Sequence, residues 1–333
     1  MNSRSSADSD STKPDADRLP LVTVITPAYN RASFLQETIA SVLGQDYPRL
    51  EYIVLDDGST DGTSQLFENY SGRISWVSHP NMGETRTVNK GFLMATGDII
   101  GVVNSDDPLL PGAIARIVEY FMRDRELLVA YPDWEMIDAT GAVVQTVTTH
   151  DYSYLDMVRW HHCIPGPGTF FRRQVIDSIG GRDTQFRYVA DFDFWIRAGL
   201  FGKFARVPEK LATFRQHPDS ASVSHKGKAM SDEHISLVKR LYALPGLPES
   251  VIKVRREAYS SAHFVAGCVC GSDFPLSRKM HFIAAILLAP VKYIGEYRRE
   301  RTFYMFPVLM RVLYFLFGWS TRFASKLSGA ERI

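Results

Sequence analysis

The chain has 333 residues, of which 45% are hydrophobic and 23% charged, and its formal net charge at pH 7 is +1. This composition is typical of a globular protein, so it excludes a chain that is disordered throughout. The near-zero net charge gives no electrostatic reason to expect nucleic acid as a partner.

Residues 1–19 are rich in Ser and Asp and lack the apolar core of a secretory signal. We therefore expect a disordered N-terminal segment. The three cysteines, Cys163, Cys268 and Cys270, are odd in number and match no zinc spacing, which favours a reducing, cytoplasmic setting. Cys268 and Cys270 lie in an apolar helical stretch, so we expect both to be buried and inert.

Short apolar strands then alternate with helices. Strands are expected at 21–26, 51–55, 73–78 and 98–103, with helices at 34–43, 63–70, from Gly83 to near Ala95, and at 112–121. Ser33 is the expected N-cap of the first helix. This order predicts an α/β fold with an open, mostly parallel sheet.

After Leu127 the pattern is less regular. Strands are expected at 127–131, 142–148, 204–207 and 211–215, and a helix at 191–200. From about residue 231 onward the pattern is helical. We therefore divide the chain into a disordered segment (1–19), an α/β domain (20–225) and a helical C-terminal region (226–333).

Polar residues gather where three of the predicted strands end. They are Pro27-Ala28-Tyr29-Asn30 after the first, Asp56-Asp57 after the second and Asp106-Asp107 after the fourth. Ligands of open α/β sheets bind at this edge. Paired carboxylates there can bind Mg²⁺ or Mn²⁺, which can bridge two phosphates. Each Asp pair alone would also fit an ordinary turn, but two pairs in one array favour a binding site.

In order and spacing, these motifs resemble the donor-binding half of family 2 glycosyltransferases with the GT-A fold. The motifs that carry the resemblance are Thr26–Arg31, Asp56–Asp61, Asn81–Gly83, Asn89–Gly91, Ala95–Asp98 and Asn104–Asp107. It continues through 165–171 and 191–197 to Arg215-Gln216-His217. The resemblance implies a Rossmann-like open mixed sheet flanked by helices, with a helical C-terminal extension.

The resemblance also implies nucleotide-binding residues. Pro27 and Tyr29 would frame the base, with Asn30 in the same loop, and Asp57 would read the base edge, which favours UDP. Two further residues complete this set: Arg86, near the base and phosphates, and Asp106, facing the ribose.

A second group of implied roles concerns the divalent metal, Mg²⁺ or Mn²⁺. Asp107 would bind it, His217 would approach the metal or the diphosphate, and Arg215 would hold a loop or a phosphate. Asn104 stands where many relatives have Asp. Asn brings no charge, so metal affinity would be lower or this position would never touch the metal.

For catalysis, Asp191 matches the base that deprotonates the acceptor hydroxyl, and Asp193 is the alternative. Attack from the face opposite the diphosphate would invert the anomeric configuration. The Gln-x-x-Arg-Trp motif of processive polymerases is missing from this region, which favours addition of a single sugar. The expected partners are a nucleotide-sugar donor and a glycan or lipid-linked acceptor, for cell-surface polysaccharide or glycolipid synthesis.

Other readings are weaker. A non-catalytic nucleotide-sugar-binding or scaffold protein on the same fold is the main alternative, whereas a dinucleotide-dependent oxidoreductase would need a Gly-x-Gly-x-x-Gly turn after the first strand. The run His161-His162-Cys163 favours an acceptor-side loop or core packing over a metal site. Trp160, with polar neighbours, is the tryptophan we expect to stack on an acceptor sugar.

The C-terminal region is basic: from Asp273 onward ten Lys and Arg oppose four Asp and Glu, a net charge of +6. The apolar runs 282–289 and 303–319 fall short of the roughly 20 residues that span a bilayer. Aromatic residues beside arginines instead suit an interfacial helix on an anionic membrane. We expect peripheral attachment at the inner face of the cell membrane, with a packing domain or oligomer contact as the alternative.

Overall fold

The computed structural model describes residues 18–218, 220 and 227–289. Most of the expected disordered segment and the aromatic run 303–319 therefore lie outside the described residues. The chain forms two compact units. Unit 1 comprises Met1–Tyr152, Pro165–Thr184 and Arg197–His217, and unit 2 comprises Ser153–Ile164, Gln185–Ile196 and Pro218–Ile333. Two segments that precede residue 225 thus belong to the unit with the C-terminal helices.

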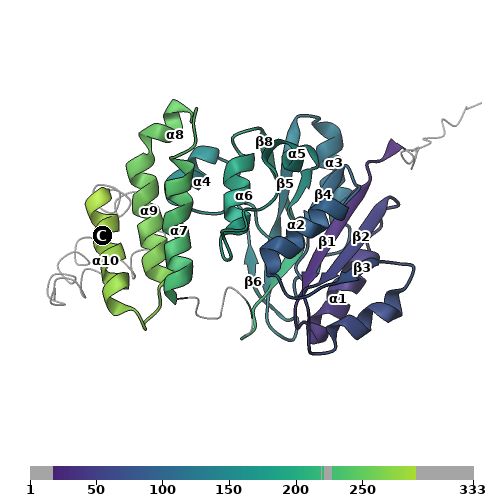
Figure 1. Cartoon of the computed structure of the whole chain (residues 1–333). Helices are drawn as coiled ribbons and strands as arrows, with labels where there is room; N and C mark the ends of the chain where they lie inside the picture. The colour runs from purple at the N-terminus through teal and green to yellow at the C-terminus, as the bar shows by residue number, and fades with distance from the viewer. Residues whose placement is uncertain (1–17, 219, 221–226, 290–333) are drawn as a thin grey trace, which may run out of the picture. The chain divides into compact units, whose positions relative to one another are not determined.

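Unit 1 contains one eight-stranded mixed sheet, in the order β3-β2-β1-β4-β7-β5-β6, with β8 also paired to β5 (Figure 1). Its strands are β1 (Val22–Ala28), β2 (Leu50–Asp56), β3 (Ser75–Ser78), β4 (Ile99–Val102), β5 (Leu127–Ile137), β6 (Val143–Val147), β7 (Phe170–Arg172) and β8 (Lys203–Arg215). Strands β1 to β4 are mutually parallel, and β7 is antiparallel to β4 and β5. The expected open, mostly parallel sheet is confirmed.

The helices of this unit cover both faces of the sheet. They are α1 (Ala32–Leu43), the 3₁₀ helix η2 (Thr63–Tyr70), α2 (Glu84–Met94), α3 (Ala113–Arg123) and α5 (Gln174–Ile179). Val22, Val24 and Val54 share a buried cluster with α1 and α3. Ile25 and Leu55, on the opposite face, lie against α2, where a Cβ at Gly91 would come within 2.5 Å of Ile25 Cγ2. Burial on both faces explains the nearly unbroken apolar runs of β1 and β2.

The start of α1 differs from the sequence prediction. Ser33 is not the N-cap, because the helix already begins at Ala32. Its first N–H groups are instead met by the loop after β2: Asp61 accepts a hydrogen bond from the N–H of Ala32, and the Thr63 hydroxyl accepts one from the N–H of Arg31. The cap therefore comes from a residue about 30 positions away in sequence, which local patterning cannot reveal.

Strand β8 also differs from the prediction of two short strands. It runs without a break from Lys203 to Arg215 beside β5. The pairing steps from Pro132–Val207 to Asp133–Lys210, so Pro208 and Glu209 lie in a bulge. A bulge needs no ladder N–H from the proline, which is why the strand continues past it. Strand β5 likewise extends to Ile137, beyond its expected end.

Unit 2 is helical. Its elements are α4 (Tyr154–Trp160), most of α6 (Ala190–Ala198), α7 (Gly227–Leu241), α8 (Glu249–Lys253), α9 (Arg255–Val269) and α10 (Pro275–Leu288). Helix α9 packs against α4, α7 and α10 (Figure 1). Within the described ranges, no helix combines the length and apolar character needed to cross a membrane. The prediction of two buried thiols is right for Cys270 and wrong for Cys268, which is exposed.

Candidate active site

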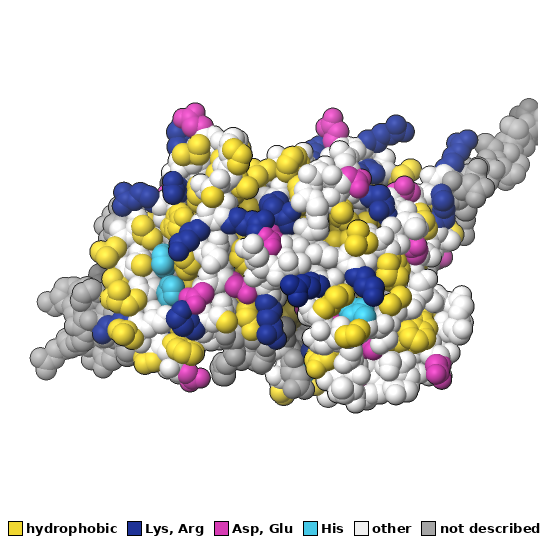
Figure 2. All heavy atoms as spheres, in the orientation of Figure 1, with side chains coloured by type: hydrophobic (Ala, Val, Ile, Leu, Met, Phe, Trp, Pro, Cys, Tyr) yellow, Lys and Arg dark blue, Asp and Glu magenta, His cyan; other side chains and the backbone are white. Residues whose placement is uncertain are grey.

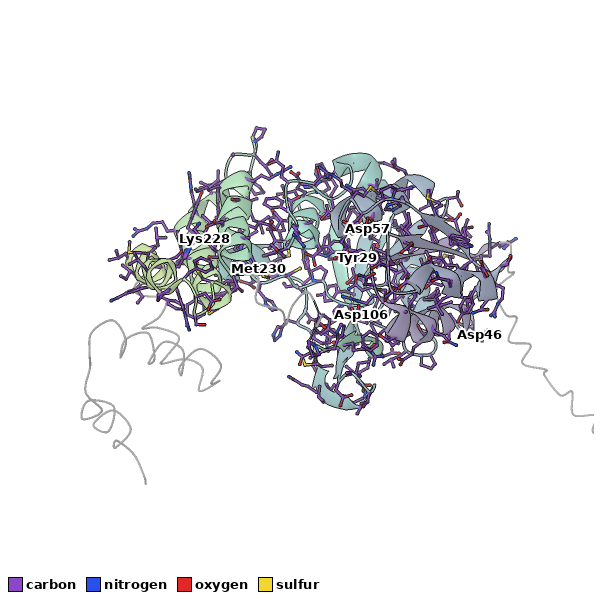
Figure 3. All side chains as sticks on the ribbon, turned by 60° about the horizontal axis from the view of Figure 1, so that its bottom comes forward. Tyr29, Asp46, Asp57, Asp106, Lys228 and Met230 are labelled. Atoms are coloured by element: carbon purple, nitrogen blue, oxygen red, sulfur yellow. The ribbon has the colours of Figure 1, made fainter. Side chains whose placement is uncertain are left out.

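The carboxyl ends of β1, β2 and β4 meet at one edge of the sheet. Ala28 pairs with Asp56, and Ile25 pairs with Val102, so the residues that follow these strands emerge close together. Figure 3 shows Tyr29, Asp57 and Asp106 at this edge, well away from Asp46, which follows α1. The topology thus gathers the polar clusters as the strand pattern predicted.

Asp57 is buried, and both of its carboxylate oxygens accept backbone hydrogen bonds. Oδ1 accepts from the N–H of Met82 at 2.7 Å, and Oδ2 accepts from the N–H of Gly83 at 3.0 Å. Gly58 follows with a positive φ, and a Cβ there would lie 2.8 Å from the nitrogen of Asn81. Asp57 therefore fixes the 81–83 loop ahead of α2, and its role in reading a base edge stays a prediction.

The loop after β1 is tied to the loop after β2 through Asn30. This residue adopts a left-handed conformation (φ 51°), which Asn tolerates better than most residues. Its N–H donates to the Ser59 hydroxyl, and its Oδ1 accepts from the N–H of Thr60 at 2.8 Å. Tyr29 is left 47% exposed, whereas Pro27 is buried within β1. Of the two residues expected to frame a base, Tyr29 alone presents an exposed side chain.

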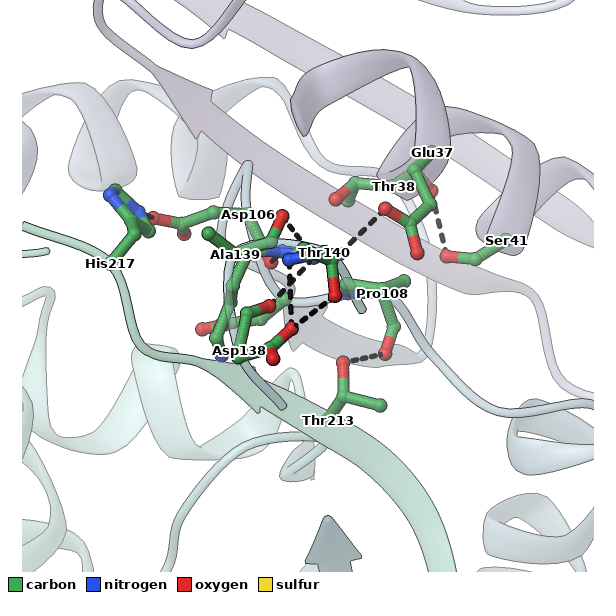
Figure 4. A network of polar contacts seen from close by, with 12 residues as sticks. Glu37, Thr38, Ser41, Asp106, Pro108, Asp138, Ala139, Thr140, Thr213 and His217 are labelled. Atoms are coloured by element: carbon green, nitrogen blue, oxygen red, sulfur yellow. Dashed lines mark hydrogen bonds and ion pairs between the residues drawn. The ribbon is translucent and has the colours of Figure 1, made fainter. Parts of the chain in front are cut away.

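Asp106 and His217 form a pair at the same edge. His217 Nε2 lies 3.0 Å from Asp106 Oδ2 (Figure 4). Arg31 Nε lies 3.3 Å from the same oxygen. The His217 ring is buried against Phe34, with 4.6 Å between ring centroids. Arg31 belongs to the motif after β1, but no role was predicted for it from the sequence. Its contact with Asp106, 75 residues away, depends on the alignment of β1 with β4.

Asp107 points into the protein. Its Oδ1 accepts from the N–H of Arg215 at 2.8 Å, and its Oδ2 accepts from Asn104 Nδ2 at 2.9 Å. Burial and the negative charge of Asp106 raise the pKa of Asp107 to about 7. The amide of Asn104 stabilises the carboxylate, because it donates a hydrogen bond that an Asp at this position could not donate. Asn104 therefore has a structural use that does not involve a metal.

Arg215 has the largest almost completely buried side chain among the described residues, and it joins several loops. Its Nε donates to the Asp106 carbonyl, one terminal nitrogen donates to the carbonyls of Asp138 and Ala139, and the other contacts Glu37 Oε2 at 2.6 Å. Figure 4 labels these four partners. The guanidinium also lies 5.1 Å from the centroid of the Phe34 ring. These contacts make Arg215 a positioning residue for the loop that carries Asp106.

Two observations bear on a divalent cation. Among residues 18–218, 220 and 227–289, no three His, Cys, Asp or Glu side chains are grouped so as to hold a metal ion. The chain does bring a carboxylate oxygen of Asp106 and an imidazole nitrogen of His217 together, and both are suitable donors for Mn²⁺. A cation at this pair fits only if diphosphate oxygens and water complete its coordination shell, which is how Mg²⁺ is often bound.

Arg86 lies in the first turn of α2, three residues beyond the loop that Asp57 holds. Its side chain is exposed, and no hydrogen bond or ion pair engages it within the described part of the chain. It is therefore available for an anionic group such as a phosphate, and its predicted role is untested.

Asp191 belongs to unit 2, in the first turn of α6. Its side chain is exposed, and its Oδ1 accepts a hydrogen bond from the N–H of Phe192 at 2.7 Å. Asp193, the alternative base, is buried and lies 3.5 Å from Arg240. The two acids thus differ in accessibility, in favour of Asp191. A common cavity for Asp191, Asp57 and Asp107 stays a prediction.

The residues suspected of acceptor contact also lie in unit 2. His161 is buried and its Nε2 lies 2.9 Å from His234 Nδ1, which agrees with core packing rather than a metal site. His162 is exposed, and Trp160 is 37% exposed. His234 was not singled out from the sequence, because an isolated His on an amphipathic helix gives no sign of its partner.

The family model described as Glycosyl transferase family 2 matches residues 23–180. That stretch contains β1 to β4 and the loops that follow them, so this part of the chain is similar to the family 2 glycosyltransferases. Hyaluronan synthase of Pasteurella multocida is 27% identical over 217 residues, and chondroitin synthase of the same species is 27% identical over 214. These matches take in 63% and 62% of this chain but only 22% of either synthase.

Solved structures agree on the fold. TarS 1-349 of S. aureus in complex with UDP-GlcNAc aligns with a TM-score of 0.63 and 17% identity, covering 81% of this chain and 82% of that one. Mannosyltransferase PcManGT of Pyrobaculum calidifontis, in complex with GDP-Man and Mn²⁺, aligns with a TM-score of 0.57 and 16% identity, covering 93% and 91%. The GT-A fold implied by the sequence motifs is confirmed.

Proposed function

We propose that this chain is an inverting glycosyltransferase that moves one sugar from a nucleoside diphosphate sugar to a hydroxyl of a glycan or lipid-linked acceptor. The observation that carries the proposal is the sheet edge on which Tyr29 and Asp106 of the matched region 23–180 lie (Figure 3), with His217, from outside that region, in contact with Asp106. An exposed aromatic ring suits a nucleobase, and the Asp–His pair suits a cation bound to a diphosphate.

UDP is the nucleotide we propose. TarS, with the highest TM-score quoted above, was solved with UDP-GlcNAc, whereas PcManGT was solved with GDP-Man. Two relatives in sequence are named synthases of hyaluronan and chondroitin. Their names support polysaccharide or glycolipid synthesis as the setting.

Asp106 and His217 would hold the divalent cation, Mg²⁺ or Mn²⁺, together with the diphosphate. When bound, the cation would offset the charge of the departing nucleoside diphosphate. Asp107 would stabilise this arrangement without touching the cation. It accepts a hydrogen bond from the backbone N–H of Arg215, which orders the end of β8 just before His217. Arg86 would contact a phosphate from α2.

Asp191 would take the proton of the acceptor hydroxyl as that oxygen attacks the anomeric carbon. The bond to the diphosphate breaks on the opposite side, so the configuration inverts. The exposure of the Asp191 carboxylate supports this role, and the ion pair of buried Asp193 with Arg240 argues against Asp193.

A screen of nucleotide sugars tests the proposal. Calorimetry with UDP in the presence and absence of Mn²⁺ should show metal-dependent binding. At least one nucleotide sugar should then be hydrolysed or transferred. Binding without hydrolysis or transfer of any donor would instead favour a non-catalytic nucleotide-sugar-binding protein, and absence of nucleotide binding would contradict both.

We further propose peripheral membrane attachment through α10. Leu276, Met280 and Leu287 lie on one face of this helix and are 72%, 56% and 71% exposed. Arg278 lies on the same helix, and Figure 2 shows Lys and Arg side chains among the hydrophobic ones there. Exposed apolar residues beside basic ones suit the surface of an anionic bilayer. We propose the inner face of the cell membrane, where the nucleotide-sugar donor would be available.

Sedimentation with lipid vesicles tests this second proposal. Binding to vesicles that contain phosphatidylglycerol, weaker binding to phosphatidylcholine, and loss of binding when Leu276, Met280 and Leu287 are all changed to Ser would support it. If the triple variant instead changes the oligomeric state measured by light scattering, with vesicle binding unaffected, the face is a contact between copies of the chain.

A further inference from the structure

We propose that helix α7 positions Asp191 for catalysis. Three α7 side chains, those of Glu233, His234 and Arg240, contact the segment 186–193 directly or through one intermediary. All of these residues belong to unit 2. The inference rests on the proposed function, because it assigns a role to contacts around the proposed base.

Glu233 holds the turn that leads into α6. Its Oε1 accepts from the N–H of Arg187 at 3.0 Å, and its Oε2 accepts from the N–H groups of Tyr188 and Val189 at 2.7 and 3.3 Å. These amides come immediately before Ala190, the first residue of α6. N–H groups at the start of a helix have no acceptor within the helix, so they need a partner from elsewhere. A carboxylate is the favoured partner at a helix N-terminus, and hydrogen bonds to a charged acceptor are stronger than neutral ones.

Arg240 contacts the two ends of the same segment. Its Nε lies 3.5 Å from Asp193 Oδ1, and its guanidinium carbon lies 5.9 Å from the centroid of the Phe186 ring. Arg240 is seven residues, or two helical turns, beyond Glu233, so both side chains project from one face of α7. The buried carboxylate of Asp193 is thereby used to fix α6 rather than to accept a proton from a substrate.

His234 reaches the segment through His161. The two imidazoles are in hydrogen-bond contact, and the His161 ring packs on Phe192 with 5.0 Å between centroids. Burial lowers the pKa of His234 to about 4, so this contact joins a neutral His234 to its neighbour at pH 7. Phe192 is thus supported directly next to Asp191.

Asp191 itself receives no side-chain support in the described parts of the chain. Its carboxylate accepts only from the adjacent N–H of Phe192, so the backbone of α6 sets its direction. Backbone position in turn depends on the contacts with α7. Since a shift of about 1 Å in a catalytic group can cost about 100-fold in rate, α7 controls the rate without touching substrate.

The test compares Glu233→Ala with Glu233→Gln, which keeps one acceptor oxygen. Asp232→Asn is the matched control, because Asp232 is the preceding α7 residue, is exposed and pairs with Lys228. We expect Glu233→Ala to lower kcat for a hydrolysed or transferred nucleotide sugar about 10- to 100-fold, with KM and UDP–Mn²⁺ affinity unchanged. Glu233→Gln should recover part of the loss, and Asp232→Asn should match the wild type.

Hydrogen exchange gives a readout that does not need activity. The amides of residues 187–189 should exchange at least about 10-fold faster in Glu233→Ala, whereas those of α9 and β1 should keep their wild-type rates. Unchanged exchange at 187–189, or unchanged kcat in Glu233→Ala, would overturn the inference. So would a loss of protection throughout α7 and α9, in both Glu233 variants alike. A wild-type chain that neither hydrolyses nor transfers any donor would refute the proposed function instead.

Discussion

Three acids with predicted roles in the site, Asp57 and Asp107 in unit 1 and Asp191 in unit 2, are held in opposite ways. At the sheet edge of unit 1, Asp57 and Asp107 are buried, and backbone N–H groups or an amide occupy both oxygens of each. In unit 2, Asp191 is exposed, and among the described residues its carboxylate accepts only from its own helix. The same side chain therefore shapes loops in one unit and stays accessible in the other.

This difference separates carboxylates that fix loop geometry from those that remain accessible for chemistry. A buried carboxylate whose two oxygens both accept hydrogen bonds from the protein stabilises a loop rather than taking a proton from a substrate. Its lone pairs already point at N–H groups of the protein. In unit 1, Asp106 is the acid that combines partial exposure with contacts to other functional groups, His217 and Arg31. We therefore expect activity to depend most on Asp191 and Asp106, and stability to depend most on the buried groups.

The largest expected effect concerns the pair Asp191 and Asp193. Asp191→Asn should lower transfer or donor hydrolysis by about 100- to 10,000-fold, the usual contribution of a general base, and leave UDP binding unchanged. Asp193→Asn should lower activity far less, by about 10-fold, through a shift of α6, and should lose about 1–3 kcal/mol of stability, since it breaks the ion pair with Arg240. Steady-state kinetics and urea unfolding measure the two effects. The reverse assignment of effects would make Asp193 the base.

Next in size is the response to metal. Asp106→Asn and His217→Ala should each weaken UDP binding in Mn²⁺ by about 10- to 100-fold and leave the weaker binding in EDTA unchanged. The reason is that each change removes one of the two donors that meet at 3.0 Å. Calorimetry with and without Mn²⁺ checks this. Equal losses in both conditions would mean that the pair contacts the nucleotide rather than a cation.

A smaller effect, on stability, should follow removal of Arg215. Arg215→Met should lower the free energy of unfolding by about 2–4 kcal/mol, because buried carbonyls of Asp106 and Asp138 lose their donor. Arg116→Met is the control: this surface arginine pairs with Glu119 and Glu209 in solvent, and its loss should cost much less than the loss of Arg215. Urea unfolding of both variants gives the comparison, and equal costs would contradict it.

The smallest expected effect is a loss of stability at acidic pH that affects unit 2 and not unit 1. Burial lowers the pKa of His234 from 6.5 to about 4, so between these values the unfolded chain binds a proton that the folded chain does not. Stability is therefore lost as the pH falls, by about 1–2 kcal/mol between pH 7 and pH 5. Hydrogen exchange should report the loss at α7 and not at β1. His234→Gln should reduce this pH dependence, although the pKa of His263, also lowered by burial, keeps part of it.

Several features of the site could be read from the sequence, and others could not. The apolar runs that became β1, β2 and β4 each end at the polar residues later found together, because consecutive strand–helix units place strand ends at one edge. The contacts of Asp107 with Arg215 and of Asp106 with His217 join residues more than 100 positions apart. No local pattern specifies such contacts, and so the inward orientation of Asp107 was not foreseen.

By itself, the sequence determined the alternation of strands and helices, the edge where ligands would bind, and the family, since these depend on periodicity and on short motifs. The tertiary structure alone decided which carboxylates are buried and which exposed. It also decided that Glu233 and Arg240 on α7 hold the segment before and within α6. Burial and hydrogen-bond partners are set by packing between distant segments, and packing has no signature at the level of single residues.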